Sequence, residues 1–210
     1  MFSTLEDSKL AENHIIICGM VENIRYFVMP LRAKHLNDPS PIVILHDELP
    51  SNKLWQHLCY FSQIYFVQGS TLSEEAFDRV NILKAKQVVI LTPIISEGER
   101  KPKSNGEDQQ PQNDDGFENN NNQENLRDAK TIFMYNIIKK KNPNVKVVTE
   151  LITQANIAYM LDDPLLYFLM RKYGYDQTPI FTSGEIYLSS LMDSLICQAY
   201  YNSALTTVLR

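Results

Sequence analysis

The feature that most constrains this chain is a recurrence of short, continuous apolar runs, each separated from the next by a helical or polar stretch. Runs of this kind are typical of strands buried on both faces, as in parallel sheets. Between them, apolar residues recur at helical spacing. Alternation of strand and helix predicts an α/β fold, a Rossmann-like doubly wound sheet that is mainly parallel. The predicted strands are His14–Cys18, Pro41–His46, Gln63–Val67, Gln87–Thr92 and Val145–Leu151.

Changes in composition divide the chain. Residues 1–12 carry acidic residues without an apolar core, which predicts a disordered lead and no signal peptide. Residues 13–183 form the predicted Rossmann-like lobe. Within it, residues 97–125 are rich in Asn, Gln, Asp and Glu, and they have too few aliphatic side chains to offset the entropy of ordering. We therefore expect 97–125 to be a disordered insert between a strand and a helix that begins at Leu126.

The end of the lobe is predicted to hold a short strand around Ile180–Thr182. A long helical pattern follows from about Glu185 to Leu209, with few charges and a broad apolar surface. No stretch approaches the roughly 20 apolar residues of a membrane span.

Charge and cysteine content argue against several classes of protein. The net charge of −5 argues against a general nucleic-acid binder, which normally shows a basic face. Cys18, Cys59 and Cys197 form no CxxC pair, so they make a poor disulfide framework and a poor zinc site. Each lies among apolar residues, and the sequence predicts three buried free thiols in a reducing compartment.

The turn after the first predicted strand bears on nucleotide binding. A dinucleotide site needs several glycines there, so that the backbone can approach the phosphates. The segment GMVENI offers only Gly19, while Asp47, after the second predicted strand, could hold a ribose hydroxyl. The sequence also lacks a GxSxG elbow, an HExxH motif and a P-loop lysine. Neither a bound nucleotide nor catalytic residues are expected.

Four blocks, in order, resemble the RCK/KTN family, the regulator-of-potassium-conductance domains. The first and last are similar to the second RCK domain of Slo-type large-conductance, calcium-activated potassium channels, most of all in FVMPLRA, Phe27–Ala33. The blocks are Asn13–Leu36, Phe66–Pro93, Glu124–Leu161 and Ser189–Arg210.

This resemblance implies a non-enzymatic regulatory domain on the cytoplasmic side of a membrane. In the family, RCK domains of a homo-tetrameric channel form a gating ring that couples ligand occupancy or the position of neighbouring domains to pore opening. Alternatives on the same fold are a nucleotide-binding enzyme, which would bind NAD(H) or ADP, and a regulatory subunit of a transporter.

The resemblance also implies a role for the C-terminal segment. Residues 184–210 correspond to the crossover helix, and the smaller lobe that follows it in the family is absent. The fragment is expected to be a homodimer or a monomer, with no nucleic-acid partner. The expected interface residues are Leu191, Leu195, Tyr200 and Leu205.

The resemblance also implies a calcium site. The family's second domain carries an acidic run, the calcium bowl, and the corresponding place here holds Asp162 and Asp163 before Pro164. Leu165 stands where the family has a further carboxylate. Calcium takes six to eight oxygen ligands. The sequence therefore predicts a reduced, weak calcium site at Asp162 and Asp163, or an acidic helix stop in its place.

Overall fold

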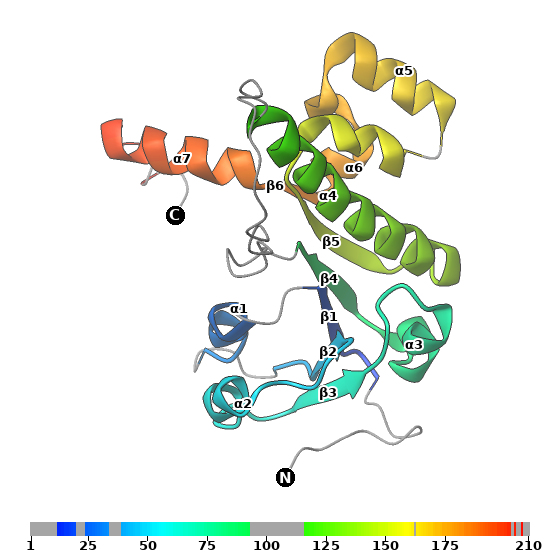
Figure 1. Ribbon diagram of the computed structural model, residues 1–210, viewed down its shortest axis with the longest axis vertical. Coiled ribbons are helices and arrows are strands. Elements are labelled where there is room, and N and C mark those ends of the chain that lie inside the picture. Colours follow the sequence, from blue (N-terminus) through cyan, green and yellow to red (C-terminus); the bar gives the residue numbers. More distant parts are fainter. Residues whose placement is uncertain are drawn as a thin grey trace, which may run out of the picture.

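The computed structural model describes residues 12–19, 24–33, 39–92, 116–161, 163–202, 204 and 207, with the backbone alone for 116–125. Its centre is a six-stranded sheet in the order β3-β2-β1-β4-β5-β6, in which every neighbouring pair is parallel (Figure 1). The order reverses between β1 and β4, which confirms the doubly wound, Rossmann-like fold. The strands are β1 (Ile15–Gly19), β2 (Ile42–His46), β3 (Ile64–Gln68), β4 (Gln87–Leu91), β5 (Lys146–Leu151) and β6 (Ile186–Leu188).

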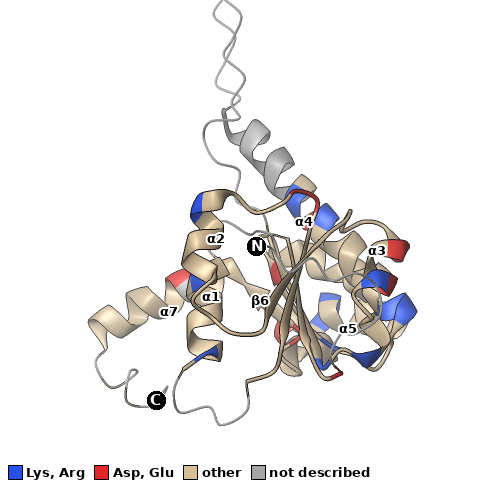
Figure 2. Ribbon diagram, turned by 90° about the horizontal axis from the view of Figure 1, so that it is seen from below, with Lys and Arg blue, Asp and Glu red and all other residues tan. Residues whose placement is uncertain are grey.

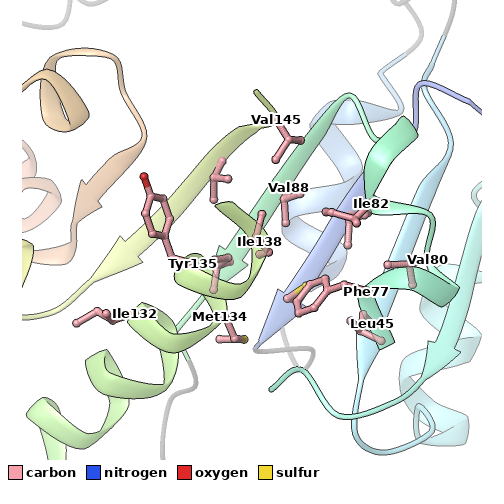
Figure 3. Close-up of a cluster of buried hydrophobic side chains, with 14 of the residues drawn as sticks. Leu45, Phe77, Val80, Ile82, Val88, Ile132, Met134, Tyr135, Ile138 and Val145 are labelled. Carbon is pink, nitrogen blue, oxygen red and sulfur yellow. The ribbon is translucent and has the colours of Figure 1, made fainter. Parts of the chain in front are cut away.

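Helices cover both faces of the sheet because side chains of each strand alternate between the faces. Ile17 of β1 joins a cluster with α1 and α2, whereas Ile16 and Cys18 join a larger cluster with α3 and α4. Figure 3 shows part of the larger cluster, where Phe77 of α3 and Met134 of α4 meet the sheet. The helices are α1 (Ile24–Leu31), α2 (Asn52–Leu58), α3 (Glu74–Arg79), α4 (Gly116–Lys141), α5 (Pro164–Tyr173), α6 (Pro179–Thr182) and α7 (Ser189–Tyr201), with 3-10 turns η1 (Ile82–Lys84), η3 (Gln154–Met160) and η4 (Tyr175–Gln177).

The C-terminal part of the lobe differs from expectation. The predicted strand at Ile180–Thr182 is wrong: these residues belong to α6, and the sixth strand is Ile186–Leu188. Thr178 precedes Pro179, and its carbonyl accepts hydrogen bonds from the backbone N–H groups of Phe181 and Thr182. Proline is favoured at the first helical position, so this local turn overrides the β-propensity of the apolar pair that follows.

Two further boundaries differ. Helix α4 begins at Gly116, before the expected start at Leu126, while the rest of the predicted insert up to residue 115 lies outside the described residues. The last helix begins at Ser189 rather than near Glu185. Among the described residues, no helix has both the length and the apolar character needed to cross a bilayer.

The cysteines divide into two kinds. Cys18 is buried in the sheet, and its burial raises the thiol pKa to about 12, so it stays protonated and unreactive. Cys59 and Cys197 are exposed, so the prediction of buried thiols is wrong for these two. Cys59 is the C-cap of α2, and Cys197 follows Ile196, which is itself 61% exposed, so apolar neighbours in the sequence do not bury either thiol.

Candidate functional site

The turn after β1 meets the carboxyl end of β4. Gly19 pairs with Leu91 in the sheet and has a φ of +96°. A Cβ added to Gly19 would lie 1.9 Å from the Leu91 carbonyl oxygen. The close approach of these two strands therefore requires the one glycine that the turn retains. Residues 20–23, the rest of the turn, lie outside the described residues.

Asp47 lies after β2, on the same edge of the sheet. Its Oδ1 accepts a hydrogen bond from the Thr71 backbone N–H at 3.1 Å, and its Oδ2 lies 3.6 Å from Lys130 Nζ. The carboxylate thus joins the end of β2 to the loop before α3 and to α4. The Asp47 side chain remains 47% exposed, with Thr71 at one carboxylate oxygen and Lys130 at the other.

A polar network closes the carboxyl ends of β4 and β5. The Thr92 hydroxyl donates to the Glu150 carbonyl oxygen at 2.8 Å, and the Ser189 hydroxyl donates to Glu150 Oε1 at 3.0 Å. Burial, and then the nearby charges of Glu150 and Asp193, raise the pKa of Tyr187. These contacts attach the first turn of α7 to the sheet.

Asp128 is a fully buried carboxylate on α4. It accepts hydrogen bonds from the backbone N–H groups of Ile152 and Thr153 at 2.9 and 2.8 Å, and from Asn156 Nδ2 at 2.8 Å. This anchor fixes the segment between β5 and η3 against α4. Downstream of η3, the chain leads directly into α5.

A second anchor holds the entry to β6. Glu185 accepts hydrogen bonds from the Tyr135 hydroxyl at 3.0 Å and from Lys139 Nζ at 3.1 Å, both on α4. The pair of Lys139 and Glu185 is half-buried, with side-chain exposures of 21% and 20%. Helix α4 therefore positions the chain both before and after the segment that contains α5 and α6.

The predicted calcium position is only partly described. Asp162 lies outside the described residues, and Asp163 is the N-cap of α5, where its Oδ1 accepts from the Leu165 backbone N–H at 2.8 Å. Among the described residues, no group of three or more His, Cys, Asp or Glu side chains could hold a metal ion. The described carboxylate thus begins a helix.

Helix α5 contacts the main core only through the half-buried Met170. It contains no buried residue, and only Leu166 and Met170 are half-buried. Large apolar side chains are exposed along it: Leu165 at 69%, Tyr167 at 48%, Phe168 at 60%, Leu169 at 41% and Tyr173 at 57%. Contiguous exposed apolar surface of this kind is typical of interaction sites.

Helix α7 also leaves the body of the domain, extending away from the sheet in Figure 1. Of the predicted interface residues, Leu191 is half-buried against the main core, Leu195 is half-buried, and Tyr200 is 84% exposed. Leu205 lies outside the described residues. Tyr200 packs edge-on against Tyr201, so two exposed aromatic rings stand together near the end of this helix.

The anchors Asp128 and Glu150 and the exposure of α5 were not predicted from the sequence. Asp128 had a signal: it lies four residues before Ile132, on the helical stripe that continues to Tyr135 and faces the core. A carboxylate at such a position needs hydrogen-bond donors from elsewhere in the chain. The alternating pattern of β5 gives no comparable signal for Glu150.

Comparisons with known proteins identify related domains. A family model described as the calcium-activated potassium channel slowpoke-like RCK domain matches residues 10–149. The calcium-activated potassium channel slo-1 of Caenorhabditis elegans is 26% identical over 220 residues, covering 94% of this chain and 19% of that protein. Potassium channel subfamily T member 1 of Mus musculus is 22% identical over 199 residues, covering 88% of this chain and 14% of that protein. The chain therefore spans less than a fifth of the length of these relatives.

A solved structure shares the fold. The human SLO3 gating ring superposes with a TM-score of 0.66 and 22% sequence identity, covering 100% of this chain and 37% of that one.

Proposed function

We propose, because the chain belongs to the family of calcium-activated potassium channel slowpoke-like RCK domains, that it is a regulatory domain of a potassium-channel gating ring. The observation that carries the proposal is the family match over residues 10–149, which include β1 to β4, α4 and most of β5. On this proposal the domain lies on the cytoplasmic side of a membrane and performs no catalysis. It couples ligand occupancy, or the position of a neighbouring domain, to the opening of the pore.

The arrangement of exposed helices supports this role. The sheet packs against helices on both of its faces, and α5 and α7 present apolar side chains outside this packed body. Other RCK domains of a homo-tetrameric ring are the proposed partners, with Leu191, Leu195 and Tyr200 of α7, together with Leu205, in one interface. A ligand or neighbour that favours one ring state by about 1–3 kcal/mol would give coupling of the usual size.

A chimaeric channel tests the proposal. The segment of the Caenorhabditis elegans slo-1 channel that matches this chain is replaced by residues 1–210, and potassium currents are recorded from excised patches. We expect the odds of opening at a fixed voltage to differ about 5- to 150-fold from those of a channel lacking the segment. Surface labelling confirms delivery to the membrane. Chimaeras that reach the surface and open like the channel without the segment would contradict the proposal.

We further propose that the Asp162–Asp163 pair contributes at most weakly to calcium regulation, and that no nucleotide binds at Gly19 and Asp47. Two adjacent carboxylates supply only part of the six to eight oxygen ligands that calcium takes, and one Asp163 oxygen already accepts a helix-capping bond. Calorimetric titration of the chain with Ca2+ is therefore expected to show no saturable heat below about 1 mM. Saturable binding at micromolar calcium that is lost in Asp162→Ala/Asp163→Ala would reverse this conclusion. The same titration with NADH tests for nucleotide binding, and no saturable heat is expected.

A further inference from the structure

Helix α5 has an outward face whose composition limits what can cover it. At 100° per residue, Leu165, Phe168 and Lys172 share one side, opposite the half-buried Leu166 and Met170. Leu165 and Phe168 are the most exposed apolar side chains of the helix. The outward face is therefore apolar along its length and cationic at its end.

The charges of α5 have one sign. Arg171 and Lys172 lie in its last turn, and the helix contains no acidic residue. Among the described residues neither cation forms an ion pair, although Lys172 Nζ lies 4.8 Å from the centre of the Tyr173 ring. A second α5 helix would bring like charges together. A surface complementary to α5 would combine exposed apolar side chains with carboxylates.

The same chain carries such a surface in the loops that follow β2 and β3 and at the start of α3. We call this surface the acidic edge. The hydrogen bond between Asp47 Oδ1 and the Thr71 N–H holds its two loops together. Leu49 and Leu72 are 52% and 47% exposed. Its members are Glu48, Leu49, Leu72, Glu74 and Glu75.

Part of the acidic edge is not neutralised within the chain. Lys140 pairs with Glu74 at 2.7 Å, whereas Glu48 and Glu75 form no ion pair among the described residues. Two carboxylates therefore remain for the two cations of α5. Figure 2 colours the ribbon red at acidic residues, as on α3, and blue at basic ones, which are the only charged residues of α5.

We propose that α5 of one copy docks on the acidic edge of a second copy of this chain. Helix α5 follows β5, whereas the acidic edge follows β2 and β3, on the opposite half of the strand order. The two surfaces lie apart along the long axis of the domain (Figure 1). The contact is head-to-tail, and every copy keeps one α5 and one acidic edge for the next, so the contact repeats into a ring or a filament. This interface goes beyond the proposed function and does not involve α7.

Charge exchange tests the pairing. The oligomeric state of the whole chain is measured by sedimentation velocity over a range of concentrations for the wild type, Arg171→Glu/Lys172→Glu, and Glu48→Lys/Glu75→Lys. We expect each double variant to weaken self-association at least about tenfold, and the combination of all four changes to recover most of it. Added salt should weaken the wild-type contact. A wild-type chain that stays monomeric, or reversals without effect, would overturn the proposal.

Two further measurements test other molecules that could cover α5. The variant Leu195→Glu places a charge on the surface of α7. If self-association depends on Leu195 and not on the α5 cations, the chain associates through α7, and docking by α5 is refuted. Flotation with phosphatidylserine vesicles tests a lipid surface; vesicle binding that requires Arg171 and Lys172, with no change in self-association, also refutes it. Circular dichroism confirms that all variants fold. The channel recordings measure a separate property, so the proposed function and this interface can fail independently.

Discussion

Gly19→Ala should destabilise the domain by more than about 3 kcal/mol. The added Cβ would lie 1.9 Å from the Leu91 carbonyl oxygen, which is backbone and cannot rotate away. Relief requires β1 and β4 to separate at the centre of the sheet, and the φ of +96° adds backbone strain for any residue with a side chain. Urea denaturation followed by circular dichroism measures the change in the free energy of unfolding.

Gly184→Ala is the matched control for this experiment. Gly184 also has a positive φ, of +73°, but a Cβ there meets no atom within 4 Å. It should therefore show the conformational cost alone, about 1–2 kcal/mol. Equal losses at both glycines would mean that the contact with Leu91 is not the cause.

Asp128→Ala should cost about 3–5 kcal/mol of stability. The substitution removes a buried acceptor from the backbone N–H groups of Ile152 and Thr153 and from the Asn156 amide. Asp128→Asn keeps the volume and one acceptor oxygen, but its NH2 group faces other N–H donors. We therefore expect a loss of stability between those of the wild type and Asp128→Ala. The same urea titration measures both variants.

Asp78→Ala provides the surface comparison. Asp78 is 62% exposed and pairs at 2.6 Å with Lys141, whose side chain is 16% exposed. Exposed pairs contribute about 1 kcal/mol or less. A loss at Asp128 no larger than that at Asp78 would show that the buried anchor does not hold the β5–η3 segment.

The strands could be predicted from the sequence because each is a short apolar run ending at a glycine, a proline or a polar residue. The first five were predicted to within one residue of their observed bounds. Strand β6 was missed because Ile186–Leu188 is only three residues long and joins α7 directly. At Ile180 and Phe181, β-propensity pointed to a strand, but the helical turn begun at Pro179 prevailed.

The candidate surfaces were harder to predict because they depend on contacts that periodicity does not encode. Asp128 acquires its role from residues 152–156, which only the fold brings to it. The apolar sequence of α5 fits a buried or an exposed helix equally well. Its exposure follows from where η3 and η4 place it, and that placement depends on the anchors around β5 and β6.

The junction of β6 and α7 lacks a loop, since β6 ends at Leu188 and α7 begins at Ser189. The hydrogen bond from the Ser189 hydroxyl to Glu150 fixes the first residue of the helix to the sheet, while the rest of the helix extends away from it, so a rotation at this fixed end moves the far end most. The 13 residues of α7 span about 20 Å at 1.5 Å per residue. A tilt of about 10° at the fixed end therefore swings the far tip by about 3 Å, an amplification obtained from helix length alone.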